Sequence, residues 1–426
     1  MMTSNRIIIL GAALWLGNAH VWAGGLHLQD LEQMALASNP TMAQVQANLR
    51  AAAALTRQAG LYPNPTVGYY GDEIRGGSYG GGEQGAFISQ SIVLGGKLGA
   101  AKRVAKLQAD EVETGGELQK QRILNNVRTL FYEVLAAQRM VEVRQSMVTL
   151  AGDVVETSRQ LGNVGQADRP DILQAEVEQQ QAIVSLRQAE RNLEASWRML
   201  AAVAGRPEMP AATLEGDLEA IPELNYQDSL QTALHTSPEL KLAQQNVERA
   251  QASLVEERRA PIPDLQVMGI LAQSLEALPT TGRQTGLIGG AQVGVQLPIF
   301  NRNQGKIAAA KDEVESARAE LERVKLRLER NLAGLFRDYD SALVAVRQYK
   351  TEMLPRAEQA YRLYQTNYQH MAGAYPQVLI SQRTLFQLEV DYIQTLESAW
   401  QGALLIQGFD LEDGLSAPVS VGLSRP

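Results

Sequence analysis

The sequence predicts a mainly α-helical protein with a membrane β-barrel, built from a duplicated unit in which two strands are followed by a long helical hairpin. The first observation is the duplication: Ser38-Asn39-Pro40 and Tyr62-Pro63-Asn64-Pro65-Thr66 correspond to Thr236-Ser237-Pro238 and Ala260-Pro261-Ile262-Pro263-Asp264. The second is that each copy continues with two short segments of alternating hydrophobicity and a long helical stretch broken once near its middle. An internal repeat of this length indicates that one structural unit is built twice.

Residues 1–23 have the features of an export signal. Arg6 is the only formally charged residue, residues 7–16 are apolar, and Val21-Trp22-Ala23 places small residues at the positions that signal cleavage requires. We therefore expect the mature chain to begin at Gly24. The apolar run is shorter than the roughly 18 residues that a membrane-spanning helix needs, and no later stretch approaches that length.

Composition excludes several kinds of site. The chain has no cysteine, which excludes disulfides, thiolate metal sites and lipidation of an N-terminal cysteine. The formal net charge is −8 and no basic block stands out, so a nucleic-acid partner is not expected. Only 5% of the residues are aromatic, and the long segments are rich in Ala, Gln, Glu, Leu and Arg, which is typical of long helices.

The strand prediction rests on a period of two. In the second copy, polar or small residues separate a series of apolar residues, namely Leu287, Ala291, Val293, Val295, Leu297 and Ile299. Such alternation over about ten residues is typical of a strand with lipid on one side and water on the other. The sequence predicts strands at 66–75, 86–94, 264–275 and 287–299. The linkers 71–85 and 276–286 are rich in Gly and polar residues, as exposed loops are.

The helical stretch of the first copy carries a heptad repeat. Valine recurs every seven residues at Val127, Val134, Val141, Val148 and Val155. Helices with a strict seven-residue apolar spacing wrap around their neighbours in a left-handed supercoil. We therefore expect the helices of this stretch to pack side by side.

Both stretches predict a helical hairpin. We expect 95–159 and 303–369 each to form one rod of about 90 to 100 Å at 1.5 Å per residue. The rods end at 161–170 and 370–376, where Gly favours a helix C-cap and Pro favours the start of the next helix. Each copy therefore ends in two antiparallel helices.

These predictions divide the chain into eight segments. They are the signal peptide 1–23, the N-terminal helices 24–63, the first β-hairpin 64–94, the first helical hairpin 95–204, a linker with helices 205–262, the second β-hairpin 263–300, the second helical hairpin 301–408 and the tail 409–426.

The number of strands predicts the assembly. One chain offers four strands, whereas a closed bacterial barrel uses at least about eight, and a membrane tolerates no open sheet edge. The barrel must therefore be shared between chains. A homotrimer with four strands and four hairpin helices per chain would form a barrel of twelve strands, continued by a tunnel of twelve helices.

No catalytic, cofactor or metal site is predicted. Gly76-Gly77-Ser78-Tyr79-Gly80 fits a nucleophile-elbow pattern and residues 80–85 fit a dinucleotide fingerprint, but both lie in one loop between two strands, without the required helix. His27, His235 and His370 are isolated, and none has a ligand-type partner three or four residues away.

The turn at 161–170 is the most informative polar site, and it allows two interpretations. Asp168 and Asp171 flank Arg169 where two helices reverse. Either carboxylate could cap the free amides at the start of the following helix. Alternatively, three copies of this turn would meet around an axis and contribute to a gate or a charge ring.

Taken together, the two repeats resemble the TolC-like outer membrane factors, the exit ducts of tripartite efflux and secretion systems. The resemblance covers essentially all of the mature chain and is closest to the branch that serves heavy-metal efflux of the cobalt-zinc-cadmium type. Its more specific motifs are Ser38-Asn39-Pro40, Gly60-Leu61-Tyr62-Pro63-Asn64-Pro65, Ser89-Gln90-Ser91-Ile92-Val93-Leu94-Gly95-Gly96-Lys97 and Pro170-Asp171-Ile172-Leu173-Gln174-Ala175-Glu176.

The resemblance also implies partners and a location. Such a protein is a trimer in the bacterial outer membrane with a long periplasmic portion. The tips of its tunnel meet a periplasmic adaptor (membrane fusion) protein and an inner-membrane, proton-driven pump of the RND type.

The same resemblance implies candidate site residues. In studied family members, carboxylates on the second-copy return helix narrow the tunnel mouth, and the aligned positions here are Gln377 and Ile380. Asp171 is the acid at the equivalent point of the first copy. The gate candidates are therefore Asp168, Arg169, Asp171 and Gln377. The candidates for docking the adaptor or pump are Gly162, Gly165, Pro170, Gly373, Tyr375 and Pro376.

We therefore expect a passive export duct without catalytic activity, which passes heavy-metal cations and takes its energy from the pump. One alternative is the same duct serving drug or other small-molecule efflux, or type I secretion. Another is a periplasmic coiled-coil tether, against which the paired amphipathic strands argue, because a tether has no use for a lipid-facing sheet.

Overall fold

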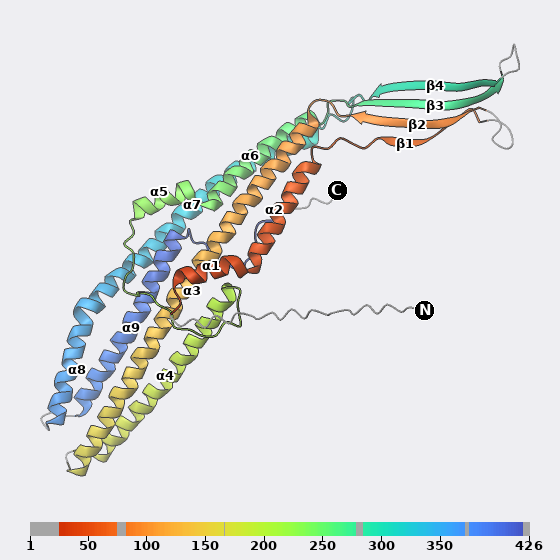
Figure 1. Cartoon of the computed structure of the whole chain (residues 1–426). Helices are drawn as coiled ribbons and strands as arrows, with labels where there is room; N and C mark the ends of the chain where they lie inside the picture. The colour runs from red at the N-terminus through yellow and green to blue at the C-terminus, as the bar shows by residue number, and fades with distance from the viewer. Residues whose placement is uncertain (1–24, 75–81, 166, 278–283, 371–374, 421–426) are drawn as a thin grey trace, which may run out of the picture.

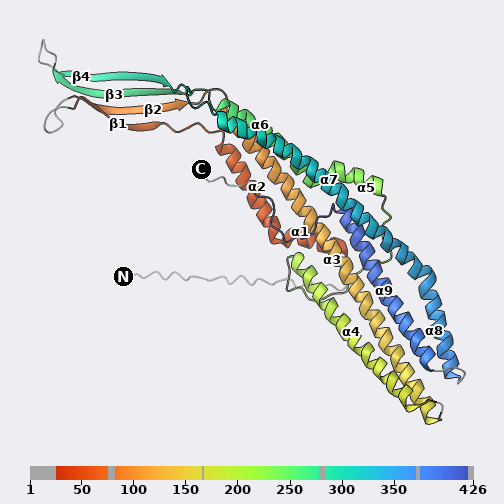
Figure 2. The ribbon, with the colours of Figure 1, turned by 180° about the vertical axis from the view of Figure 1, so that it is seen from behind.

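The structure is a computed structural model that describes residues 25–74, 82–165, 167–277, 284–370 and 375–420. The molecule is elongated, with a β-sheet at one end and the far ends of the long helices at the other (Figure 1). The view from behind shows the same separation (Figure 2). The predicted signal peptide lies outside the described residues.

The predicted unit of two strands and a helical hairpin is found twice. In the first copy the elements are α1 (Leu28–Ser38), α2 (Pro40–Gln58), β1 (Thr66–Asp72), β2 (Glu83–Ile92), α3 (Lys97–Asn163) and α4 (Arg169–Val203). In the second copy they are α5 (Tyr226–Thr236), α6 (Pro238–Arg259), β3 (Leu265–Ala277), β4 (Gln284–Val295), α7 (Gln304–Gln348), the π turn η1 (Tyr349–Met353), α8 (Leu354–Gln369) and α9 (Tyr375–Gln407).

A motif that ends in proline starts a helix in each copy: Ser38-Asn39-Pro40 before α2 and Thr236-Ser237-Pro238 before α6. The Asn39 side chain accepts a hydrogen bond from the Thr41 amide at 2.9 Å, and Pro40 occupies the first helical position, where a missing N–H costs nothing. The Asn39 amide group also donates to the Val203 carbonyl at 3.0 Å. The motif therefore both starts α2 and ties it to the end of α4.

The second long helix differs from the prediction of one continuous rod. A π turn at Tyr349–Met353 separates α7 from α8. Pro355, directly after this turn, has no N–H to donate, and its ring would clash with the carbonyl four residues earlier in a regular helix. The wider π turn relieves this conflict. In the first copy α3 is uninterrupted over its 67 residues.

The four strands form one antiparallel sheet in the order β1-β2-β3-β4. The predicted strand limits are partly wrong. β3 continues to Ala277 and β4 begins at Gln284, so both enter the segment predicted to be a loop. β4 ends at Val295 rather than near 299, because Pro298 has no N–H for the ladder.

The main core joins both copies around α3, where part of the predicted heptad seam is buried. Val127, Val134 and Val155 are buried, whereas Val141 and Val148 are only half-buried. A straight helix has 3.6 residues per turn, so a seven-residue repeat drifts around its surface. The seam is therefore continued by the neighbouring Met147, Ala151 and Val154, which are buried.

Trp400 of α9 lies in this core and offers a stability test. Its ring stacks on Tyr132 with centroids 3.5 Å apart, and its indole N–H donates to the Leu218 carbonyl at 2.7 Å. We expect Trp400→Ala to lower the free energy of unfolding by about 3–5 kcal/mol, because it leaves a cavity and an unpaired carbonyl. Trp400→Phe keeps an aromatic ring and should cost about 1–2 kcal/mol. Denaturant unfolding followed by circular dichroism checks both values, and equal losses would contradict this role.

The C-terminal tail returns along α3 towards α2. Buried side-chain amides hold its backbone: Asn125 donates to the Gly408 carbonyl at 2.9 Å, and Gln119 donates to the Gly414 carbonyl at 3.1 Å. Further along, Asn48 of α2 donates to the Val419 carbonyl at 3.1 Å. The tail therefore fills the groove between two helices of the first copy.

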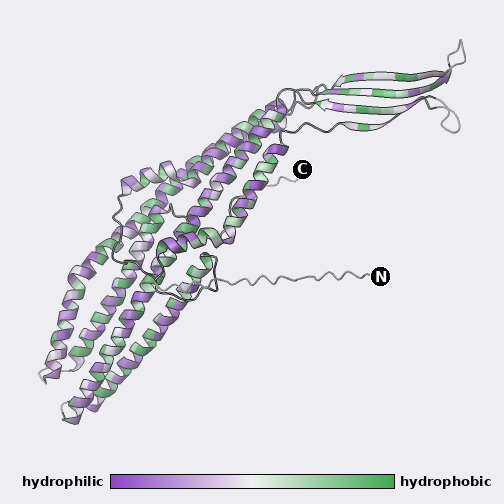
Figure 3. Cartoon of the chain, viewed as in Figure 1, coloured by the Kyte–Doolittle hydropathy of each residue, from purple (hydrophilic) through white to green (hydrophobic). Residues whose placement is uncertain are grey.

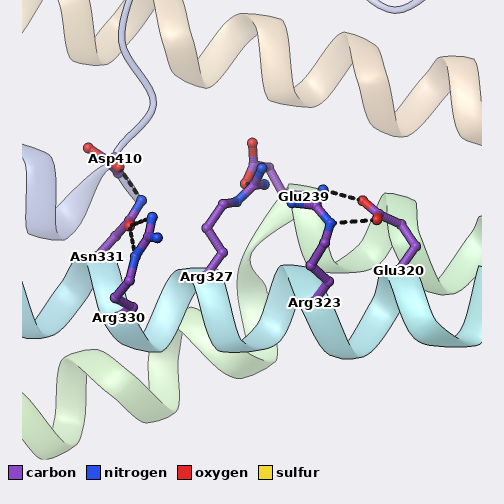
Figure 4. Close-up of polar contacts among 7 residues, drawn as sticks. All are labelled: Glu239, Glu320, Arg323, Arg327, Arg330, Asn331 and Asp410. Atoms are coloured by element: carbon purple, nitrogen blue, oxygen red, sulfur yellow. Dashed lines mark hydrogen bonds and ion pairs between the residues drawn. The ribbon is translucent and has the colours of Figure 1, made fainter.

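Polar side chains on α7 hold the neighbouring segments (Figure 4). Arg327 pairs with Glu239 of α6 at 2.7 Å, and Asn331 donates to the Asp410 carboxylate of the tail at 2.7 Å. Arg323 pairs with Glu320 one turn earlier on α7 itself, at 2.6 Å. α7 is thus bound to α6 of the same copy and to the C-terminal tail.

Hydrophobic and hydrophilic residues are interspersed along the long helices (Figure 3). Within the described residues, no helix is both long enough and apolar enough to cross a membrane.

Candidate functional site

The sheet has one strongly apolar face. The register aligns Val67 with Ile88, Ile88 with Gly269, and Gly269 with Ala291, which fixes the residues that share this face. All the large apolar side chains that are exposed on the described strands lie on it, namely Val67, Tyr69, Ile88, Ile92, Leu271, Leu287, Val293 and Val295. In water such a face would be unstable, so it is suited to contact with lipid.

The opposite face of the sheet is mainly polar or small. Thr66, Ser89 and Gln292 lie on it, together with several glycines. A smaller group of apolar residues crosses the middle of this face, and these side chains are half-buried rather than exposed. The alternation predicted from the sequence therefore agrees with the register.

Both edges of the sheet are open within one chain. β1 and β4 each have a single neighbour, so one side of each strand presents backbone N–H and C=O groups without a strand partner in the described chain. Such groups cannot remain unpaired in hydrocarbon. The sheet is therefore complete in a membrane only when another strand covers each edge.

Charged side chains fix the junction between the sheet and the helices. Lys97 at the start of α3 pairs with Asp264 at 2.9 Å, and Asp264 also accepts a hydrogen bond from the Leu94 amide at 3.0 Å. Burial acts to raise the pKa of Asp264, but these two hydrogen bonds hold it below its ordinary value. Gly95 and Gly96 have φ values of 67° and 66°, a left-handed conformation that favours glycine, where the chain turns from β2 into α3.

At the other end, the two hairpins pack together around three tyrosines. Tyr361 and Tyr368 of α8 and Tyr375 of α9 are buried there. Tyr368 and Ser158 of α3 share a hydrogen bond at 3.2 Å between their hydroxyl oxygens. The aliphatic residues of this tip cluster are Val154, Val155, Leu161, Ala175, Val378 and Leu385.

An ion pair also joins the hairpins at the tip. Arg383 of α9 donates from Nε to Glu178 Oε2 of α4 at 3.2 Å and from Nη2 to Oε1 of the same carboxylate. The Glu178 side chain is only 12% exposed, whereas that of Arg383 is 55% exposed. A largely buried carboxylate with two charge-assisted hydrogen bonds makes a directional contact. This pair therefore connects α4 to α9 close to the predicted mouth.

Some polar atoms at the tip lack partners. Tyr361 Oη and Gln382 Nε2 are buried and have no hydrogen-bond partner among the described residues. Burial, and to a lesser extent the charge of Asp153, raises the pKa of Tyr361 to about 12. A buried polar group without a partner costs about 1–3 kcal/mol. The contact between the hairpins is therefore less stable than its apolar packing alone would make it.

A cleft of about 580 Å³ lies farther from the tip, between α3, α8, α9 and the linker 213–219. Glu389 lies in it, and burial raises the pKa of this carboxyl although Arg139 acts in the opposite direction. Lys350 of the π turn pairs with Glu219 of the linker at 2.7 Å. The π turn is thus tied to the linker 213–219 beside this cleft.

The gate candidates lie at the tip but make few contacts. Asp168 is the N-cap residue of α4, yet its exposed side chain makes no capping hydrogen bond, so the capping interpretation is wrong for this carboxylate. Asp171 is half-buried in the first turn of α4, where its negative charge interacts favourably with the positive end of the helix dipole. Arg169 and Gln377 are exposed. In the described part of the chain, no ion pair joins Asp168, Arg169 or Asp171 to another residue.

The docking candidates differ in exposure. Gly165, Pro170 and Pro376 are exposed, and Gly162 is half-buried. Tyr375 is buried against Tyr368, with ring centroids 5.9 Å apart, so its side chain stabilises the tip and is not offered to a partner. Gly373 lies outside the described residues.

Sequence reasoning missed the residues that join the hairpins. Tyr361, Tyr368 and Tyr375 recur every seven residues, and this spacing was the available signal. No local pattern points to Glu178 and Arg383, which are 205 residues apart in the chain. Among the described residues, no three His, Asp or Glu side chains are grouped as metal ligands.

The family described as outer membrane efflux protein matches residues 31–206 and 229–404, once on each copy. The cobalt-zinc-cadmium resistance protein CzcC of Cupriavidus metallidurans is 28% identical to this chain over 389 residues, which cover 90% of each protein. The nickel-cobalt-cadmium resistance protein NccC of Alcaligenes xylosoxydans xylosoxydans is 25% identical over 301 residues, 70% of this chain and 66% of that protein. The predicted duplication is confirmed by the double match.

Solved structures share the fold. The outer-membrane channel OprN gives a TM-score of 0.76 at 16% identity and covers 91% of both chains. VceC of Vibrio cholerae gives 0.72 at 16% identity and covers 90% of this chain and 95% of its own. The predicted resemblance to TolC-like channels is thereby confirmed. Because the family matches both copies over most of the chain, and the channel fold is shared, this chain belongs to the outer membrane efflux protein family.

Proposed function

We propose that this chain is the exit duct of a tripartite efflux system that expels heavy-metal cations through the outer membrane. The observation that carries this proposal is the similarity to CzcC over 90% of both proteins. The duct is passive and has no catalytic activity, and an inner-membrane proton-driven pump of the RND type supplies the energy. The long helices extend into the periplasm.

The working unit is a homotrimer. The open edges of β1 and β4 support this assembly, because each edge needs a strand from another chain in a membrane. Three chains with four strands each close a barrel of twelve strands, and the strongly apolar face of the sheet contacts lipid. The mainly polar face then lines the pore.

The tips of the hairpins lie deepest in the periplasm and meet the adaptor protein and the pump. Gly162, Gly165, Pro170 and Pro376 form this contact surface, and Gly373, which lies outside the described residues, stays a candidate from the sequence alone. Asp168, Arg169, Asp171 and Gln377 line the mouth. Asp168, Arg169 and Gln377 are exposed and Asp171 is half-buried within one chain, which leaves them available to neighbouring copies.

The gate role can be separated from helix capping. We expect Asp168→Ala combined with Asp171→Ala to raise single-channel conductance in planar bilayers, because weak charge pairs of about 0.2–1 kcal/mol each are lost at three positions. The trimer should remain intact, since Asp168 makes no side-chain cap bond. Loss of thermal stability with parental conductance would favour capping by Asp171 and remove both residues from the mouth.

Susceptibility of a deletion strain tests the cargo. We expect deletion to lower resistance to cobalt, zinc and cadmium and the intact gene to restore it, while tolerance of uncharged drugs stays the same. A strain that loses drug tolerance but keeps its metal resistance would favour the alternative duct. The mass of the protein extracted from the outer membrane tests the assembly separately. If this mass, after subtraction of the bound detergent, is that of a folded monomer, the trimer is contradicted whatever the cargo is.

A further inference from the structure

The pore-facing side of the sheet carries an apolar patch that the export of metal ions does not require. The register arranges this face in rows across the four strands. One row is Gly68, Phe87, Ile270 and Gly290, and the next is Tyr70, Gly85, Ala272 and Ile288. These two rows contain no charged residue. A hydrated divalent cation gains little from such a surface, because these rows offer it no carboxylate, imidazole or thiolate ligand.

Phe87 covers a glycine of the neighbouring strand within this patch. A Cβ atom added to Gly68 would be 2.6 Å from Phe87 Cε1 and 2.7 Å from Cζ, so the ring occupies the space above the glycine. Part of the ring thus rests on β1. The Phe87 side chain is only half-buried, so the rest of it is accessible from this face of the sheet.

The rows on either side of the patch are mainly polar, and the row farther from the helices is acidic. The row nearer the helices is Thr66, Ser89, Met268 and Gln292. The row on the far side is Asp72, Glu83, Ser274 and Gly286. Tyr70 donates a hydrogen bond to Asp72 at 3.2 Å, so the aromatic and acidic rows are directly connected.

The charges of the sheet have one sign. The described strands contain Asp72, Glu83 and Glu276 and no lysine or arginine. An aromatic ring attracts a cation over its face, and neighbouring carboxylates strengthen this attraction. The patch therefore complements an organic molecule that has an aromatic body and a positive charge.

We propose that Phe87, Ile270, Tyr70 and Ile288, with Asp72 and Glu83 beside them, form a binding site for aromatic organic cations inside the barrel. The inference rests on the proposed function, since this face must line the pore of a trimer. It adds a second class of cargo to the metal cations. The patch is repeated three times around the pore, so a passing molecule meets it on every side.

Block of single-channel current tests this site. We use the full-length trimer in planar bilayers, tetraphenylphosphonium as the aromatic cation and tetramethylammonium as a cation without rings. Tetraphenylphosphonium should reduce the current, and the same concentration of tetramethylammonium should not. Phe87→Ser with Ile270→Ser should raise the half-blocking concentration about tenfold, the loss expected for one cation–π contact and some apolar area.

Further variants separate the apolar and charged contributions. Phe87→Leu keeps the volume over Gly68 but removes the ring face, so it should raise the half-blocking concentration about threefold. This conservative variant also serves if the double serine variant fails to fold. Asp72→Asn with Glu83→Gln should weaken block and lower the preference for cations over anions. Gln292→Ser, on the same face outside the patch, is the matched control and should behave as the parent does.

The outcomes distinguish this site from the duct itself. Normal conductance with equal block in the parent, the double serine variant and Phe87→Leu would overturn the site and leave the duct intact. Normal conductance without any block in the parent would do the same. A failure of the parent to form conducting trimers would overturn the proposed function and this site with it.

Discussion

Cysteines placed on β1 and β4 should convert the protein into covalent trimers on oxidation. The chain has no native cysteine, so every disulfide can be assigned to the introduced pair. Val67→Cys on β1 is combined in turn with a cysteine at Ala291, Val293 or Val295 on β4, all on the same face of the sheet. A disulfide requires Cα atoms about 4.4–6.8 Å apart, so we expect one register to react strongly and the others weakly.

The pattern of products carries the test. Because the two strands come from neighbouring chains in a closed ring, partial oxidation should give dimers and trimers, and complete oxidation should leave trimers. Val67→Cys with Gln292→Cys is the matched control, since position 292 faces the opposite side of the sheet and should not cross-link. Ladders that extend beyond the trimer, or monomers in every register, would contradict a closed three-chain barrel.

Removal of the ion pair at the tip should open the duct. Arg383→Ala leaves the Glu178 carboxylate, only 12% exposed, without its cation and breaks the contact between α4 and α9. We expect a cost of about 1–3 kcal/mol to the closed arrangement of the hairpins, because a largely buried charge is left without its partner. Tyr361 Oη and Gln382 Nε2, which have no partners among the described residues, already weaken this contact.

The measurement is single-channel conductance, with the trimer content checked in detergent. Arg383→Ala should conduct more than the parent. Arg187→Ala should not, because Arg187 and Glu190 form an exposed ion pair within α4 and do not connect two hairpins. The exchanged pair Glu178→Arg with Arg383→Glu should recover part of the closed state. If Arg383→Ala conducts as the parent does, this ion pair does not hold the tunnel closed.

The sheet could be predicted well from the sequence because its signal is local. The alternation around Val293 and Val295 places residues on two faces wherever the strand runs, and the register confirms those faces. The ends of the strands were harder to predict from the sequence. Pro298 stops β4 early, whereas the strands around Glu276 extend into a segment whose polar and glycine-rich composition resembles a loop.

The tip was harder to predict because its contacts depend on how the two hairpins meet. Asp168 has the chemistry of a capping residue and stands at the cap position, yet its side chain makes no cap bond. Glu178 and Arg383 look like ordinary residues of solvated helix faces, and only the approach of α4 and α9 brings them together. The sequence shows that Pro355 interrupts the second long helix, but it does not show that a π turn at Tyr349–Met353 accommodates this proline.

The position of the C-terminal tail makes the packing of α2 against α3 depend on a distant part of the chain. Asn125 and Gln119 donate to carbonyl groups that lie 283 and 295 residues further along. If the tail were detached, both buried side-chain amides would lose these partners, and a buried polar group without a partner is costly. The segment after α9 therefore couples the folding of the first copy to that of the second.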